Sequence, residues 1–214
     1  MKKILLSGLL ALISVGAFAQ TTQGSISVGG DMGLGSHATS NINNEYSDDT
    51  KGININLSPS VGYFVKNGLE IGLRTTLSFG SSTTQHNRSD VKNKINSFGY
   101  GLGPFVTKYV PITERLHFTA TGGFGFDHER TKNPDLDQKL LTTTTGYYVS
   151  AAPGLTFFAT EKLGFSIAMG GISYTTSTEK VKYNSPETET TRDNFNLTFS
   201  PGSSHIGIRY YINR

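Results

Sequence analysis

The sequence predicts an all-β protein: a closed, antiparallel, up-and-down transmembrane β-barrel of eight strands. Apolar and polar residues alternate with a period of two over segments long enough to cross a bilayer as tilted strands. Short and long connections between these segments alternate along the chain. No segment after residue 20 is apolar enough to span as a helix, and lipid tolerates no unpaired backbone, so a membrane chain of this composition must close into a barrel.

Residues 1–19 have the layout of a secretory signal peptide. Met1–Lys3 is positively charged, Ile4–Phe18 is apolar, and small residues at positions 17 and 19 flank Phe18. We expect cleavage between Ala19 and Gln20, which leaves residues 20–214 as one β-barrel domain. An uncleaved N-terminal anchor is the alternative.

Composition excludes several classes of function. The net charge of +3 falls to +1 without Lys2 and Lys3, and no run of Lys or Arg appears, so we expect no nucleic-acid partner. The chain has no Cys, which excludes disulfides and thiolate metal sites. It has 25 Gly, 13 Phe and 10 Tyr, and small residues opposite bulky ones suit a narrow barrel.

The strands follow from the alternation. Between Leu69 and Phe79 the odd positions are apolar, apart from one Thr, and the even positions are small or polar. Residues 53–65, 98–107 and 116–127 repeat this pattern. The predicted strands, in order, are 24–35, 52–65, 69–80, 95–109, 116–127, 144–158, 163–175 and 193–212.

The connections between strands predict the orientation. Tight turns lie at 66–68, 111–115 and 160–162. Outer-membrane barrels have short turns on the periplasmic side and longer loops outside. We therefore expect both termini in the periplasm and four long extracellular loops, at residues 36–51, 81–94, 128–143 and 176–192.

Two irregularities interrupt the pattern. Pro59, Pro104 and Pro153 lie inside predicted strands, where a proline gives up a ladder hydrogen bond, so a bulge or local widening is expected at each. In the last strand the apolar positions change from odd numbers to even ones from Ile206 onward. This change predicts a bulge at residues 201–204.

The aromatic residues gather near both ends of the predicted strands. Such bands are typical of the girdles at the two interfaces of a bilayer, although aromatic residues also favour strands in general. The band near the short turns comprises Tyr63, Phe64, Tyr109, Phe118, Phe157, Phe158, Phe165, Tyr210 and Tyr211.

The inward phase places six charged or titratable side chains in the lumen: Asp31, Glu70, Arg74, His117, Asp127 and Arg209. One interpretation is a set of buried ion pairs that fills and plugs the barrel, since such charges need partners to stay ionised. The other is a charged constriction or a proton-linked gate. Eight strands leave little open lumen, which favours the plug.

No enzyme or metal site is evident in the sequence. The five His residues are scattered, and none lies at metal-ligand spacing from another. His37, His86 and His128 fall in or beside the expected outer loops, but none forms a recognisable Ser-His-acid arrangement. We therefore predict a non-enzyme with no catalytic residues, metal or cofactor.

The C-terminal segment His205–Ile212 has a polar residue, a Gly, an aromatic residue and a final hydrophobic residue at fixed spacing. With the signal peptide and the repeated Pro-containing strands, it resembles the porin-like outer-membrane β-barrel domain family of Gram-negative bacteria, in particular the small OmpA/OmpX-type barrels. The resemblance implies that the barrel-assembly machinery reads Gly207, Tyr210 and Ile212. The chain departs from the family pattern by carrying Asn213 and Arg214 past the hydrophobic end.

The expected location is the outer membrane, in contact with its lipid and lipopolysaccharide. The expected function is structural or surface-interacting, through the outer loops and an external ligand that the sequence does not identify. A minor porin for small solutes is one alternative. Because some eight-stranded barrels modify lipid A, a loop-based hydrolase is a second.

Overall fold

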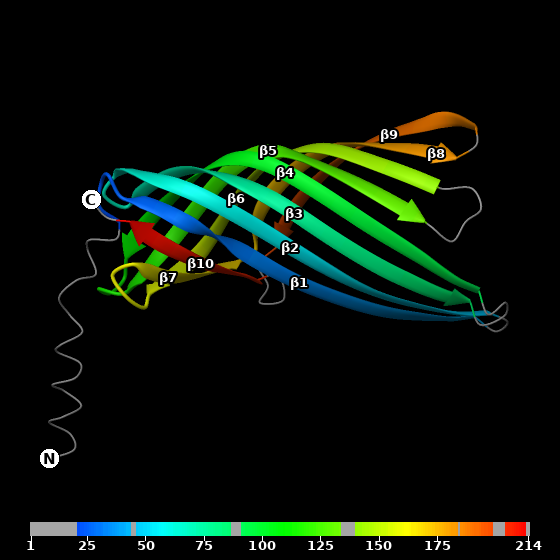
Figure 1. Ribbon diagram of the computed structural model, residues 1–214, viewed down its shortest axis with the longest axis horizontal. Helices are drawn as coiled ribbons and strands as arrows, with labels where there is room; N and C mark the ends of the chain where they lie inside the picture. Colours follow the sequence, from blue (N-terminus) through cyan, green and yellow to red (C-terminus); the bar gives the residue numbers. More distant parts are fainter. Residues whose placement is uncertain are drawn as a thin grey trace, which may run out of the picture.

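The computed structural model describes residues 21–43, 46–86, 91–133, 140–183, 185–198 and 204–212, and they form an elongated antiparallel barrel (Figure 1). The predicted signal cleavage between Ala19 and Gln20 lies outside these residues. The strands are β1 (Ile26–Asn43), β2 (Tyr46–Lys66), β3 (Leu69–His86), β4 (Val91–Pro111), β5 (Leu116–Asn133), β6 (Leu140–Phe158), β7 (Leu163–Met169), β8 (Gly171–Tyr183), β9 (Ser185–Thr198) and β10 (Ser204–Ile212).

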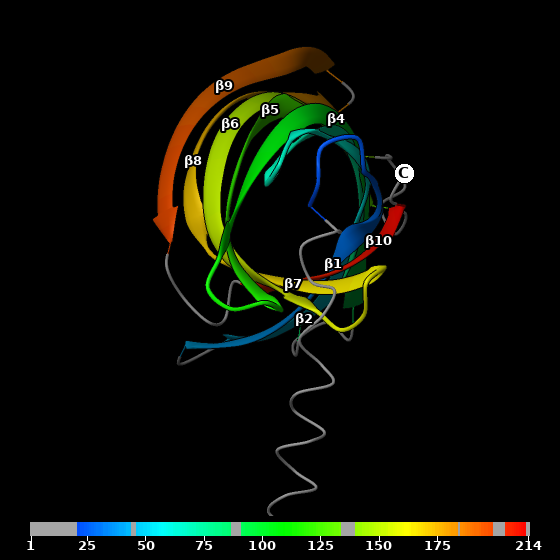
Figure 2. The ribbon, with the colours of Figure 1, turned by 90° about the vertical axis from the view of Figure 1, so that its left-hand side faces the viewer.

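The strands form a ring when viewed along the barrel axis (Figure 2). Strands β1 to β6 pair in chain order. On its other side β6 pairs with both β7 and β8, and β10 joins β7 to β1. The all-β, antiparallel prediction is confirmed. The described residues contain ten strands rather than eight because the seventh pass of the chain divides into β7 and β8, and the eighth into β9 and β10.

Alternate side chains face opposite sides of the wall. On β3, Ile71 and Leu73 are exposed on the outside, whereas Glu70 is buried in the lumen and Arg74 is half-buried there. The same alternation continues around the ring and gives an outer surface of exposed apolar side chains, here called the apolar belt. Such a belt is what a bilayer-spanning wall presents to lipid.

The expectation of four long extracellular loops is wrong. The stretches 36–51, 81–94, 128–143 and 176–192 are mostly strand, and their ladders continue to the Asn43–Tyr46, His86–Val91, Asn133–Leu140 and Tyr183–Ser185 pairs. The alternation of apolar residues stops where the wall leaves lipid. The backbone hydrogen bonds of the ladder continue, because they do not depend on apolar side chains. Thr-rich segments keep β propensity, and facing hydroxyls bond directly, as Thr50 does with Thr84 at 3.0 Å.

Pro59 and Pro104 open the ladder without shifting its register. Next to Pro59, the pairing of β2 with β3 stops at Leu57 and resumes at Ser60 in the same register. The hydroxyl of Thr75 donates to the Pro59 carbonyl at 3.4 Å, which satisfies part of the opened ladder. The ladder between β4 and β5 opens in the same way at Pro104. Of the two expected solutions, these prolines therefore use local widening and not a bulge.

A bulge does occur where β7 becomes β8. Between the Gly154–Ala168 pair and the Ala151–Ile172 pair, two residues of β6 face three of the neighbouring strand. Gly170, in the middle, has φ +74°, which favours glycine. The extra residue changes the outward positions from odd numbers on β7 to even numbers on β8.

The eighth pass carries a larger irregularity. Thr198 pairs with Gly171, and Ser204 pairs with Met169. Between these two pairs the eighth pass spans six residues, whereas its partner spans only two. The register on the two sides therefore differs by four residues. Of the predicted bulge at 201–204, residues 201–203 lie outside the described residues.

Candidate functional site in the barrel lumen

Four aromatic rings fill the end of the lumen beside the short turns. They are buried, lie next to one another, and form what we call the floor: Phe64, Tyr109, Phe158 and Tyr211. Ring centroids lie 5.5 Å apart between Phe64 and Tyr109, and 5.2 Å apart between Phe158 and Tyr211. These distances are typical of packed aromatic pairs.

The floor residues were expected in an aromatic girdle facing lipid. The structure places them inside, because each occupies an inward position of its strand while Tyr63, Phe157 and Tyr210 beside them face outward. The alternation of each strand contained this information. Grouping aromatic residues by height alone concealed it.

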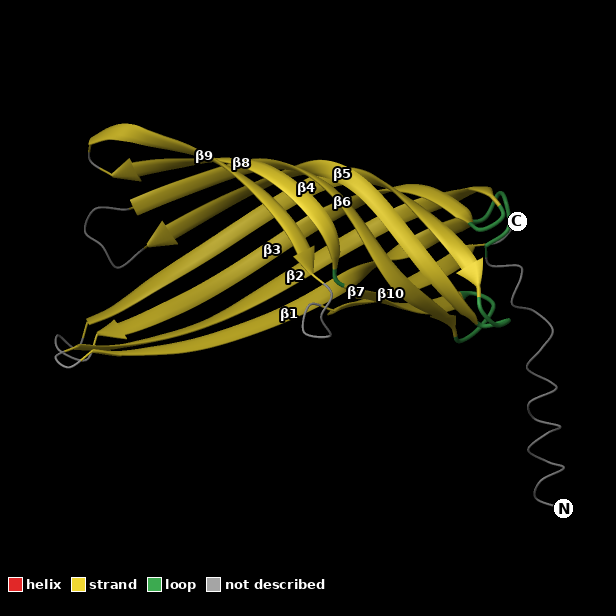
Figure 3. Ribbon diagram, turned by 180° about the vertical axis from the view of Figure 1, so that it is seen from behind, coloured by secondary structure: helices red, strands yellow, loops and turns green. Residues whose placement is uncertain are grey.

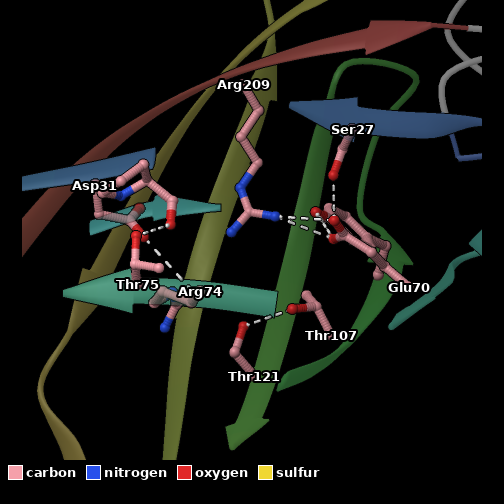
Figure 4. A network of polar contacts seen from close by, with 10 residues as sticks. Ser27, Asp31, Glu70, Arg74, Thr75, Thr107, Thr121 and Arg209 are labelled. Atoms are coloured by element: carbon pink, nitrogen blue, oxygen red, sulfur yellow. Dashed lines mark hydrogen bonds and ion pairs between the residues drawn. The ribbon is translucent and has the colours of Figure 1, made fainter. Parts of the chain in front are cut away.

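Glu70 and Arg209 form an ion pair directly above the floor (Figure 4). Arg209 Nη1 donates to both carboxylate oxygens of Glu70, at 3.0 and 3.1 Å. The Ser27 hydroxyl donates to Oε1, and the Tyr109 hydroxyl donates to Oε2 at 2.8 Å. Glu70 is 0% exposed and Arg209 6% exposed. Three donors thus satisfy a carboxylate that could not stay charged alone in this position.

Non-neighbouring strands supply this pair, so it crosses the lumen. Glu70 comes from β3 and Arg209 from β10, and β2 and β1 lie between them in the wall. Gly62 on β2 gives the Glu70 carboxylate its space, because a Cβ at position 62 would overlap Glu70 Oε1. The pair therefore connects distant parts of the ring through the interior.

A second, looser pair lies nearer mid-height. Arg74 Nη2 is 3.6 Å from Asp31 Oδ2, and the two side chains are 27% and 19% exposed. The Arg74 and Arg209 guanidinium carbons lie 5.1 and 5.4 Å from the Phe105 ring centroid. Phe105 is thus a cation–π partner for both arginines.

His117 and Asp127 do not join these pairs among the described residues. His117 packs edge-on against Phe158, with centroids 4.9 Å apart, and its buried Nδ1 has no hydrogen-bond partner. Asp127 lines the cavity above the floor and lies against Gly101. Four of the six predicted lumen residues are thus brought together in two pairs.

A cavity of about 410 Å³ lies above the floor. Its lining includes Asp31, Arg74, Phe105, Asp127, Tyr148 and His205. In the part of the chain that the structure describes, no three His, Asp or Glu side chains group as metal ligands. His128 Nδ1 is 2.9 Å from the Thr145 hydroxyl, and the ring packs against Tyr100. The side chain of His86 lies outside the described residues.

The three residues of the expected assembly signal lie on β10. Tyr210 and Ile212 face outward and are about half exposed, whereas Gly207 faces the lumen. A Cβ on Gly207 would overlap Asp31 Oδ1 and Ser166 Oγ. The interior packing thus gives its own reason for a glycine at this position.

Comparison with known proteins places the chain in a family. The model of the outer membrane protein β-barrel domain family matches residues 5–200. Similar solved structures include the outer membrane protein OprG from Pseudomonas aeruginosa, at 13% identity and TM-score 0.48, covering 92% of this chain and 100% of that one. The N-terminal barrel domain of Pseudomonas aeruginosa OprF is similar at 15% identity and TM-score 0.33, over 89% of this chain and 98% of that one.

The translocator domain of the autotransporter NalP from Neisseria meningitidis is similar at 8% identity and TM-score 0.41, over 99% of this chain and 96% of that one. No curated protein matches the sequence. None of the described residues belongs to a helix long and apolar enough to cross a membrane. The family match extends over most of the chain: this protein belongs to the outer membrane protein β-barrel domain family.

Proposed function

We propose that this protein is a non-enzymatic outer-membrane barrel with a closed lumen, whose role is structural and surface-interacting. The observation that carries the proposal is the floor together with the Glu70–Arg209 pair. The rings occupy the periplasmic end, and the pair neutralises its own charges. Ions would meet packed aromatic surface there, and no unpaired charge of this pair is left to attract them.

The positions of the chain ends support a periplasmic location for both termini. Ile26 at the start of β1 pairs with Ile212 at the end of β10, so both ends lie beside the short turns. This orientation fits barrels with short periplasmic turns. The belt would contact outer-membrane lipid and lipopolysaccharide. The assembly machinery would read Gly207, Tyr210 and Ile212 during insertion.

The strands that continue past the belt support a role outside the cell. Here β8 and β9 carry exposed ion pairs across their ladder: Lys180 with Glu189 at 3.3 Å, and Arg192 with Glu179 at 2.8 Å. Such pairs add little stability in water, but they present charged and hydroxyl groups on a strand-built surface. We propose that an external ligand binds this extended wall and not long loops.

Single-channel recording in planar bilayers tests the closed lumen. The unmodified protein should give no stable conductance steps. Replacing Phe158 and Tyr211 together by Ala removes two rings of the floor and should produce steps. The matched control replaces their neighbours Phe157 and Tyr210, which are 46% and 47% exposed on the lipid side, and should stay silent.

Stable steps from the unmodified protein would reject the closed lumen and favour the minor porin. The lipid A hydrolase has a separate readout. If mass spectrometry showed lipid A altered by this protein, and His128→Ala abolished the change, the non-enzymatic role would be wrong.

A further inference from the structure

Exposed basic side chains gather on one sector of the outer surface, beyond the apolar belt. This sector is formed by β2, β3, β4 and β5, which lie side by side and continue past the belt toward the end of the barrel away from the C-terminus (Figure 3). Its exposed cationic residues, here called the basic patch, are Lys51, Lys92, Lys94, Arg130 and Lys132. The floor and the ion pairs of the lumen do not involve any of them.

The register of the ladders shows that the patch faces away from the lumen. Opposed residues in a ladder point to the same side of the sheet. Arg130 on β5 opposes Phe98 on β4, and the Phe98 ring is exposed on the outer face. Lys92 and Lys94 on β4, and Lys132 on β5, lie an even number of residues from this pair in an uninterrupted ladder. They therefore share its outward face.

The cations lie close enough together to act on one anion. Lys94 and Lys132 are diagonal neighbours across the β4–β5 ladder, and such neighbours lie about 7–8 Å apart. Arg130 and Lys132 are alternate residues of one strand, about 7 Å apart. Lys51 and Lys94 oppose Thr83 from either side of β3. Side chains as long as Lys and Arg can converge on a single phosphate group from these positions.

Carboxylates do little to offset this charge. Among the described side chains of β2 to β5 beyond the belt, Asp49 is the one acid that faces outward. Glu129 on β5 opposes the buried Gly99 and so faces the lumen. The neighbouring sector of β8 and β9 differs, because Lys180 there is paired with Glu189 at 3.3 Å. The excess of positive charge therefore belongs to β2–β5.

Exposed aromatic side chains fix the height of the patch relative to a bilayer. Phe79 and Phe98 pack with ring centroids 5.3 Å apart, and Tyr100 and Phe126 with centroids 6.5 Å apart, all exposed on the outer face. Such rings mark the interface between hydrocarbon and headgroups. Arg130 lies directly opposite Phe98, and the other basic residues lie farther out along their strands. The patch is therefore at the level of the lipid headgroups.

An apolar groove lies on the same sector, within the belt and nearer the short turns. It has a volume of about 860 Å³, and its lining includes Ile71, Leu73, Pro104, Val106, Gly122 and Phe124. Gly122 occupies an outward position, where it leaves the space that a bulky side chain would fill. A lipid with an acyl chain in this groove would present its headgroup to the basic patch.

We propose that the basic patch and the groove together bind one phosphorylated lipid, lipopolysaccharide, through the phosphates of its lipid A head. Lys and Arg are the side chains that bind phosphate, and Arg130 can do so through two parallel hydrogen bonds. The choice of lipopolysaccharide rests on the proposed function, which directs this end of the barrel to the outside of the cell. The charge of β2–β5 thus adds a phosphate site on one side of the barrel to the general contact of the belt with lipid.

Binding of lipid A to the refolded full chain in non-ionic detergent tests the site. Native mass spectrometry counts the lipid A molecules that the folded barrel retains as the lipid concentration rises. Replacing Lys94, Arg130 and Lys132 together by Gln should weaken binding about 100-fold, since each basic residue beside an anionic lipid contributes roughly fivefold. Unchanged binding would show that the patch does not hold the phosphates.

A matched control removes the same charge from the other end of the barrel. Replacing Lys66, Lys108 and Lys162 by Gln removes three exposed cations near the short turns, and this variant should bind lipid A as the unmodified protein does. An equal loss in the control would show that binding follows net charge alone, and the proposal would be wrong.

The chemistry of the lipid is tested on the unmodified protein, so this comparison does not depend on the folding of any variant. Lipid A stripped of its phosphates keeps its acyl chains and should bind about 100-fold more weakly. Equal binding would mean that the groove alone holds the lipid. If phosphatidylglycerol bound as tightly as lipid A, the patch would recognise any anionic lipid. Either result overturns the proposal.

Heat-modifiable gel migration shows that each variant is folded before binding is measured. Binding in micelles requires neither a closed lumen nor a particular orientation in a membrane. Conductance steps from the unmodified protein would therefore reject the closed lumen without changing lipid A binding, whereas loss of the phosphate preference would reject this site in a barrel that stays closed.

Discussion

Single residues act in this barrel mainly through partners across the lumen. Glu70 is completely buried, yet Arg209, Ser27 and Tyr109 provide its donors from three other strands. Removing one member of such a pair leaves an uncompensated buried charge. The Asp31–Arg74 pair is longer and partly exposed, so water can replace a lost partner.

The first prediction contrasts the two arginines. Arg209→Ala should lower the free energy of unfolding by about 3–5 kcal/mol, because it leaves Glu70 buried and unpaired. Arg74→Ala should cost less, since Asp31 remains partly hydrated. Urea unfolding in detergent, followed by far-UV circular dichroism, measures both losses. Equal losses of unfolding free energy in the two variants would show that burial of the ion pair does not determine the cost of removing its arginine.

Single elements show how the strands absorb residues that do not suit a ladder. Pro59 and Pro104 open one side of a strand and keep its register. Gly170 adds a residue, which turns the outward face from odd to even numbers between β7 and β8. These irregularities lie within or beside the belt, where the wall still presents apolar groups to lipid.

The second prediction concerns the bulge. Gly170→Ala should cost about 1–2 kcal/mol of stability, because a Cβ disfavours the positive φ at this position. Gly122→Ala is the matched control: an added Cβ there makes only ordinary contacts, at 3.8 Å, with Ser150 and Val106. Urea midpoints in detergent compare the two. A neutral Gly170→Ala would mean that the bulge relaxes freely.

The whole molecule depends on ring closure by its last strand. β10 pairs with β1 on one side and β7 on the other, so it completes the half of the wall beside the short turns. The floor residue Tyr211 and the ion-pair residue Arg209 lie on the same strand. Closure of the wall and filling of the lumen therefore occur together.

The third prediction is at this scale. Refolded into detergent, the full chain should migrate differently on a gel before and after boiling, as a closed barrel with no free edge does. A chain ending at residue 198 lacks β10 and should lose the unboiled folded band. A chain lacking only Asn213 and Arg214 keeps β10 and should retain it. A folded band from the chain ending at 198 would contradict the role of β10.

The sequence by itself determined the class of fold, the order of the strands and the inward position of the charged residues, because alternation of side chains is a local property of each strand. It also located the irregularities at the prolines and near residue 201. It did not reveal that the outer polar stretches are strands, since a ladder outside lipid needs no apolar pattern.

Only the tertiary structure decided which inward residues meet. Glu70 and Arg209 are 139 positions apart, and their contact depends on the shear of the whole ring, to which every ladder contributes. The same holds for the four rings of the floor, which come from strands β2, β4 and β10 and the end of β6. Facing is fixed within one strand, but height around a closed wall is fixed by all of them together.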